Sequence, residues 1–208
     1  MGLIAKGSSG SSMKPIEQGP HIAVCNMLID LGKQYSESFK NSQEKVLIGW
    51  EVPDEVYESD GKQFPRTITK RYTNSLNERA TLRQDLAAWH GRDFTTKELE
   101  GFDLCNIVGT NCLINVIHRE GSNGKTYAEV ASIMALPKGT QKQALSGPKT
   151  IFNLDTDPLE EVDNLPEWIA KTIKQSETYK ERMIPAEPVF DEMPPQDADD
   201  FGDGDLPF

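Results

Sequence analysis

Positively charged and aromatic side chains lie close together in two stretches of this sequence. The first stretch contains Phe64, Arg66, Lys70, Arg71 and Tyr72, and we include Trp50, which precedes it in the sequence. The second stretch offers Arg119, Lys125 and Tyr127. Cations neutralise the phosphates of a nucleic acid, and aromatic rings stack on unpaired bases. We therefore interpret the two stretches as parts of a surface that binds single-stranded nucleic acid without sequence preference.

A purely structural interpretation of the aromatic residues stays open. Aromatic rings are mostly buried, so Trp50 and Tyr72 can equally belong to the core, with the charges forming a solvated face. Trp89 falls on one apolar helical stripe with Leu82 and Leu86, and we expect it in the core.

Residues 197–208 combine acidic and apolar side chains. An anionic segment attracts basic surfaces from a distance, while a terminal aromatic ring and its carboxylate can fill an apolar pocket with a basic rim. A tail that only aids solubility is the alternative, but an apolar end serves solubility poorly. The residues expected to bind a partner protein are Asp199, Asp200, Asp203, Asp205, Leu206, Pro207 and Phe208.

This terminal pattern resembles the acidic tip of bacterial and phage single-stranded DNA-binding proteins. The resemblance implies docking onto replication, recombination and repair proteins, with Leu206, Pro207 and Phe208 as anchors and the aspartates as steering charges. Over residues 14–145 the body is loosely similar to phage proteins encoded near replication genes. That similarity is carried by the segments Trp50–Pro53, Leu86–Phe94 and Gly124–Tyr127.

No arrangement of residues predicts catalysis. Residues 119–126 end like a phosphate-binding P-loop, but the first position holds Arg119 where Gly is required, and a strand follows where a helix is needed. The histidines His21, His90 and His118 lie far apart in the sequence, and no nucleophile motif accompanies them. We expect a protein that is not an enzyme and has no cofactor.

The three cysteines, Cys25, Cys105 and Cys112, form no C-x-x-C pair. A zinc site can be drawn from Cys105, Cys112 and His118, with Cys25 or His21 as the fourth ligand, but the spacings match no zinc finger, ribbon or knuckle. We expect no metal and reduced thiols, buried as small hydrophobic side chains.

Charge is distributed unevenly along the chain, whose net charge is −11. Residues 1–150 hold 18 Lys and Arg against 17 Asp and Glu, whereas residues 151–208 hold 4 against 16. A nearly neutral body can still carry a basic face, while the acidic C-terminal quarter stays solvated. The sequence has neither a long apolar run nor a secretory signal, so we expect a cytoplasmic protein without a membrane segment.

Five strands are predicted from apolar and β-branched runs. The first is expected to end at Gly32 and the second at Pro53, while an Asn-Gly turn joins the last two into a hairpin. Gly49, inside the second strand, predicts a bulge or bend. The expected strands cover residues 22–31, 45–52, 66–73, 111–119 and 125–136.

Three helices are predicted between and after these strands. Ser75 and Glu78 form the pattern of a capping box for a helix that ends at Gly91, and Thr95 and Glu98 form a second box for a short helix. The third helix covers residues 166–183, and the side chains expected to dock it on the body are Leu165, Ile169, Ile173 and Met183.

The order of these elements is that of an OB-fold, although other folds share it. We predict a mainly β protein with α insertions, built as a five-stranded Greek-key barrel that coats single-stranded DNA in phage or bacterial replication, recombination or repair. The sequence leaves the oligomeric state open, between a monomer and a homo-oligomer. The alternatives are an adaptor or helicase-loading protein that binds no DNA, and a nuclease or recombination enzyme. The expected regions are a flexible arm (1–19), the DNA-binding body (20–150), a linker and amphipathic helix (151–184) and a disordered acidic tail (185–208).

Overall fold

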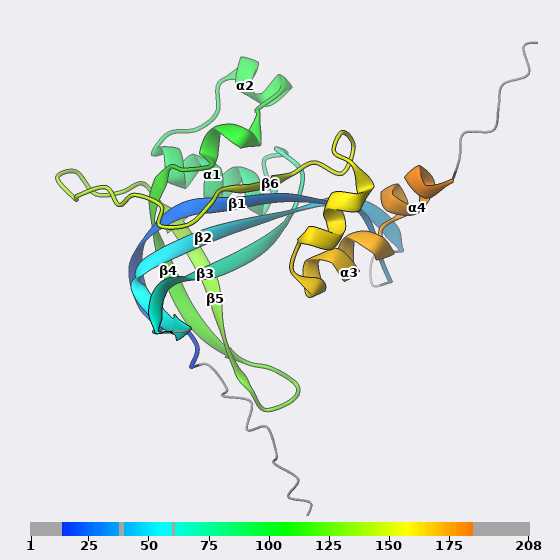
Figure 1. Ribbon diagram of the computed structural model, residues 1–208. Coiled ribbons are helices and arrows are strands. Elements are labelled where there is room, and N and C mark those ends of the chain that lie inside the picture. Colours follow the sequence, from blue (N-terminus) through cyan, green and yellow to red (C-terminus); the bar gives the residue numbers. More distant parts are fainter. Residues whose placement is uncertain (1–13, 38–39, 60, 185–208) are drawn as a thin grey trace, which may run out of the picture.

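A curled antiparallel sheet of five strands forms a half-barrel at the centre of the computed structural model (Figure 1). The structure describes residues 14–37, 40–59 and 61–184. Hydrogen-bonded neighbours follow the order β3-β2-β1-β4-β5, and a short sixth strand pairs with β1. The strands are β1 (Gly19–Ser36), β2 (Asn41–Ser59), β3 (Lys62–Thr73), β4 (Asn111–Glu120), β5 (Thr126–Met134) and β6 (Thr150–Phe152).

Helices cover the half-barrel from two directions (Figure 1). Two of them lie between β3 and β4 in the chain, and the other two follow β6. Within the described residues, none of the helices is long and apolar enough to cross a membrane. The helices are α1 (Thr81–His90), α2 (Thr96–Glu100), α3 (Glu167–Gln175) and α4 (Glu177–Met183), with 3-10 turns at Leu104–Ile107 and Leu159–Asn164.

The first two strands are longer than the sequence predicts, because β-bulges carry them past their expected ends. Gly32 was expected to end β1, but it adopts a left-handed conformation with φ of 67°. The register with β2 shifts between Asp30 and Gly32, and pairing then continues to Ser36. In β2 the register shifts between Val52 and Val56 instead of ending at Pro53.

Gly49 lies opposite a bulge, as the sequence predicts. The register shift falls in β1 between Cys25 and Met27, which pair with Trp50 and Gly49. A Cβ atom at Gly49 would lie 2.9 Å from the Cβ of Met27, so only glycine fits there. The bulge bends β1 and helps the sheet to curl.

Helix α1 begins later than its predicted capping box. Its N-cap is Ala80, which has no side-chain cap, so the box expected at Ser75 and Glu78 is wrong. Gly91 ends the helix in a left-handed conformation, as predicted. The box that precedes α2 is confirmed, since Thr95 accepts a hydrogen bond from the amide of Glu98.

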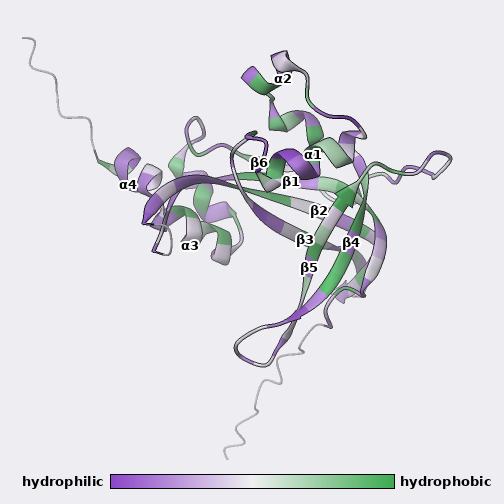
Figure 2. Cartoon of the chain, turned by 180° about the vertical axis from the view of Figure 1, so that it is seen from behind, coloured by the Kyte–Doolittle hydropathy of each residue, from purple (hydrophilic) through white to green (hydrophobic). Residues whose placement is uncertain are grey.

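The concave side of the half-barrel holds the larger core. Trp50 of β2 is fully buried and contacts Trp89 of α1, with ring centroids 6.0 Å apart. Leu82 and Leu86 complete the predicted apolar stripe of α1, and both are buried. Figure 2 shows hydrophobic residues along the middle of β4 and β5 and hydrophilic residues towards their turn.

A second core lies on the outer face of β1, where the sequence predicts a linker. The linker expectation is wrong for residues 151–165, because Phe152 and Leu154 are buried against β1 and β6 pairs with it in parallel. Residues 150–183 therefore form a lobe that packs on the sheet, which we call the C-terminal lobe. Its core comprises Ile29, Leu31, Leu47, Phe152, Leu154, Val162, Ile169, Ala170 and Ile173.

The predicted third helix is divided in the structure. Ser176 is buried and separates α3 from α4, and its hydroxyl accepts a hydrogen bond from the amide of Tyr179. Ile169 and Ile173 are buried as expected, and Leu165 packs beside them. Met183 is 58% exposed, so its predicted docking role is wrong.

Candidate nucleic-acid interface

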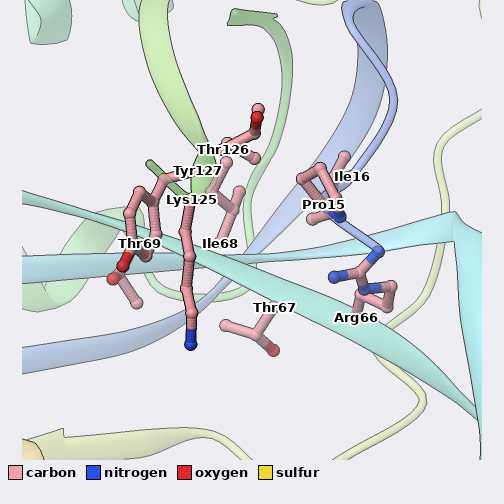
Figure 3. A pocket seen from close by; sticks show the side chains of 10 residues that line it. Pro15, Ile16, Arg66, Thr67, Ile68, Thr69, Lys125, Thr126 and Tyr127 are labelled. Carbon is pink, nitrogen blue, oxygen red and sulfur yellow. The ribbon is translucent and has the colours of Figure 1, made fainter. Parts of the chain in front are cut away.

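The two outermost strands of the half-barrel, β3 and β5, border a groove of about 620 Å³ (Figure 3). No hydrogen-bonded ladder joins these strands in the described part of the chain. We call this space the seam groove. Its lining consists of Pro15, Ile16, Arg66, Thr67, Ile68, Thr69, Lys125, Thr126, Tyr127 and Ala128.

The seam groove brings together residues from both stretches of sequence that were expected to bind nucleic acid. Arg66 comes from β3, while Lys125 and Tyr127 come from the β4–β5 hairpin (Figure 3). No carboxylate belongs to the lining. Arg66 pairs with a carboxylate outside the lining, since Oε2 of Glu55 lies 3.7 Å from its Nη1. The groove therefore offers cations and hydroxyl groups to an anionic ligand.

The hairpin turn holds Tyr127 at the groove. Its ring is 49% exposed, and its hydroxyl accepts a hydrogen bond of 2.7 Å from Nδ2 of Asn123. A Cβ atom at Gly121 would lie 2.6 Å from the Tyr127 ring, so the ring packs closely on the turn. An exposed ring that is fixed in place loses little entropy when a base stacks on it.

A second groove, of about 640 Å³, begins where the seam groove ends along β3. We call it the β3-end groove. Residues 66–69 of β3 line the seam groove, and residues 70–73 line this one. Its lining consists of Gln43, Lys45, Lys70, Arg71, Tyr72, Thr73, Ser75, Asn77, Arg79, Ala80 and Thr81.

Lys70 and Tyr72 share one carboxylate beneath the β3-end groove. Oδ2 of Asp85 accepts a hydrogen bond of 2.7 Å from Nζ of Lys70 and another of 2.7 Å from the hydroxyl of Tyr72. Burial and the negative charge of Asp85 raise the pKa of Tyr72 above its ordinary value. The charge of Lys70 is therefore already balanced, whereas Arg71 is exposed.

The structure corrects the expectation that Trp50 and Tyr72 stack on bases. Trp50 is fully buried and Tyr72 is only 3% exposed, and both belong to the concave core. Neither ring offers a face to a ligand. Both residues are therefore part of the core, which was the alternative to base stacking.

The remaining predicted residues lie outside both grooves. Arg119 forms an ion pair of 2.5 Å with Glu129 across the β4–β5 ladder. Phe64 is 40% exposed near the β2–β3 turn and packs against Tyr57, with centroids 5.7 Å apart. The sequence analysis missed Tyr57, which the pairing of the two strands brings opposite Phe64.

Lys45 and Arg79 were also missed as candidates. Lys45 belongs to β2 and pairs with Thr73, so the strand register carries it into the β3-end groove. Arg79 comes from the loop before α1. Either residue could have been proposed from the sequence only once the register of β2 and β3 was known.

The cysteines do not assemble a site with the histidines. Cys25 and Cys112 are buried as expected, and burial raises the pKa of Cys25 to about 12. Cys105 lies in a 3-10 turn and is exposed, so its expected burial is wrong. His118 shares a hydrogen bond of 2.7 Å with the carbonyl oxygen of Ile16. Among the described residues, His, Cys, Asp and Glu form no group of three or more that could hold a metal ion.

The residues predicted to bind partner proteins lie outside the described residues. They are Asp199, Asp200, Asp203, Asp205, Leu206, Pro207 and Phe208.

Comparison with known proteins adds no identification. No protein family matches the chain. No curated protein matches it either. The functional argument therefore depends on the geometry of the grooves and on the sequence.

Proposed function

We propose that this protein binds single-stranded DNA without sequence preference and has no enzymatic activity. The observation that carries the proposal is the seam groove, because Arg66, Lys125 and Tyr127 all line it and no carboxylate belongs to the lining. Cations that follow phosphates and rings that stack on bases are the two requirements for such binding.

The fold gives this proposal independent support. We take the half-barrel as an OB-fold, because its strand order β3-β2-β1-β4-β5 and the position of α1 between β3 and β4 match that layout. In an OB-fold the second and third strands and the turn between the last two bind oligonucleotides. Lys125 and Tyr127 belong to that turn and the strand after it, and Arg66 belongs to the third strand.

We further propose that the C-terminal residues recruit replication, recombination or repair proteins of a phage or its bacterial host. The support is the sequence pattern of acidic residues that ends in Leu206, Pro207 and Phe208. An anionic segment with one terminal aromatic anchor fits a basic-rimmed apolar pocket on a partner.

The binding proposal is tested by titrating fluorescently labelled oligo-dT with the full chain and following anisotropy. The variant Arg66→Gln/Lys125→Gln should bind at least about tenfold more weakly, and its log-log salt slope should fall by about 1.4, since two phosphate contacts are lost. The matched control Lys171→Gln/Lys180→Gln removes the same charge from exposed positions on α3 and α4 and should bind like the wild type.

Labelled DNA is a better reporter here than the protein's own tryptophans. Trp50 and Trp89 are buried in the concave core, and Trp168 is on α3, outside both grooves. Absence of oligo-dT binding by the wild type in dilute buffer would overturn the proposal and favour a replication adaptor that binds no DNA.

A further inference from the structure

The β3-end groove carries positive charge that no described carboxylate balances. Lys45 donates hydrogen bonds to Oε1 of Gln43 at 2.8 Å and to Oγ1 of Thr73 at 2.7 Å, and both acceptors are neutral. Within the described residues, neither Lys45 nor Arg71 nor Arg79 forms an ion pair. Among the residues that the structure describes, three cations thus line one groove without a carboxylate partner.

Lys70 differs from these three cations. Its ammonium group is bound to Asp85, and its side chain is only 16% exposed. Asp85 holds Lys70 and the Tyr72 hydroxyl together. We assign Lys70 a positioning role, and the cationic groups of the groove that form no ion pair in the described chain are those of Lys45, Arg71 and Arg79.

The start of α1 adds to the positive character of the groove. Ala80 and Thr81 belong to the lining, and Ala80 provides no side-chain cap. The first turn of the helix also has no acidic residue. Uncapped amide groups and the helix dipole favour a negative charge at this position. The helix therefore strengthens an anion site that the side chains already define.

We propose that the β3-end groove is an anion subsite that binds a backbone phosphate of the nucleic-acid strand held in the seam groove. This inference rests on the proposed function, because one strand, β3, lines both grooves in succession. Arg66 and Arg71 lie about 17 Å apart along β3 at the usual rise per residue. A ligand that reaches both grooves must therefore span several nucleotides.

The pKa of Lys45 reflects a second cation beside it in the groove. Burial and the neighbouring Arg71 lower the pKa of Lys45 below its ordinary value. A phosphate bound between the two side chains would relieve their repulsion and favour the charged form of the lysine.

The test compares labelled oligo-dT of about 4 and about 12 nucleotides, lengths within the range that OB-folds cover. We expect the short oligonucleotide to occupy the seam groove, so Lys45→Gln and Arg71→Gln should bind it like the wild type. Each variant should bind the long oligonucleotide about tenfold more weakly, with a salt slope smaller by about 0.7. Lys171→Gln is the matched control, and Arg79→Gln repeats the test from a loop position if a strand variant fails to fold.

Competition with inorganic phosphate at constant ionic strength distinguishes a site for a backbone phosphate of the nucleic acid from a site for free phosphate. One outcome is that Lys45→Gln and Arg71→Gln no longer bind inorganic phosphate but still gain as much affinity as the wild type from the short to the long oligonucleotide. In that case the groove binds a free phosphate, and the inference is overturned. If the variants still bind inorganic phosphate and still gain affinity with oligonucleotide length, the inference is also overturned, while the proposed function stands. Absence of binding of either oligonucleotide by the wild type removes the proposed function itself.

Discussion

Strand β3 and the first half of the C-terminal lobe carry opposite charge. Within the described chain, β3 has four cations and no carboxylate, whereas residues 153–167 have six carboxylates and no cation. The first region is an outer strand of the half-barrel, and the second packs on the outer face of β1. The charged residues are Lys62, Arg66, Lys70 and Arg71 in β3, and Asp155, Asp157, Glu160, Glu161, Asp163 and Glu167 in the lobe.

This difference explains how an acidic protein can attract a polyanion. Net charge is a sum over the chain, but association depends on the local field where the ligand arrives. If the protein binds DNA as proposed, β3 should attract the nucleic acid and the lobe should repel it, so that the two regions together orient it. The five experiments below test this contrast, from the largest expected effect to the smallest.

Charge reversal on β3 should have the largest effect. Arg66→Glu/Arg71→Glu places carboxylates in both grooves, and we expect oligo-dT affinity to fall at least about a hundredfold at about 0.1 M salt. Lys171→Glu/Lys180→Glu makes the same net change on the lobe and should bind within about threefold of the wild type. Equal losses in the two variants would show that total charge, and not its position, controls binding.

Removal of an exposed aromatic ring should have the second-largest effect on oligo-dT affinity. Tyr127→Ala should weaken oligo-dT binding about tenfold, because one base loses its stacking partner. The matched control is Tyr35→Ala, another exposed tyrosine, which is 60% exposed at the far end of β1. If Tyr127→Ala binds normally, the seam groove is a purely electrostatic site.

Deletion of residues 197–208 should tighten binding severalfold at low salt. We expect the deleted acidic residues to compete with DNA for the cationic grooves, and the gain should vanish at about 0.5 M salt because charges are then screened. Anisotropy titrations of both chains at two salt concentrations measure this. Unchanged affinity at low salt would show that the tail does not compete for the grooves.

Neutralising the lobe should change the affinity little. Glu160→Gln/Glu161→Gln removes two exposed charges, and we expect oligo-dT binding to tighten by less than about twofold at about 0.15 M salt, where the Debye length is about 8 Å. A large gain would mean that the lobe lies close to the path of the DNA.

The pH dependence of binding should report Lys45. Its charge contributes below its lowered pKa and is lost as the pH rises through that value, which happens earlier than for an ordinary lysine. Lys45→Arg keeps the charge, so the ratio of wild-type to variant dissociation constants should rise as the pH passes through the lowered pKa of Lys45. A constant ratio would place Lys45 outside the phosphate contact.

Local patterns predicted much of the half-barrel. The Asn-Gly turn, the apolar stripe of α1 and the Thr95–Glu98 capping box each depend on residues a few positions apart, and all three are found. Strand ends were predicted less well. At Gly32 the sequence alone does not distinguish a turn from a bulge, because both use a left-handed glycine.

The candidate site depended on contacts that the sequence does not reveal. Alternation placed Lys70 and Tyr72 on one face of β3, but their burial depends on Asp85, which α1 brings to them. Lys45 enters the β3-end groove only through the register of β2 and β3. The parallel pairing of β6 with β1 joins residues far apart in the chain, so no local pattern marks it.

Strand β1 takes part in both cores, since Cys25 and Leu28 face the concave core while Ile29 and Leu31 face the lobe. Neither core can open without exposing apolar surface on this shared strand, so we expect them to unfold as one cooperative unit. A ligand bound along β3 then stabilises the whole body by mass action. Backbone amides of α3, far from the bound strand, should accordingly exchange their hydrogens more slowly when DNA is present.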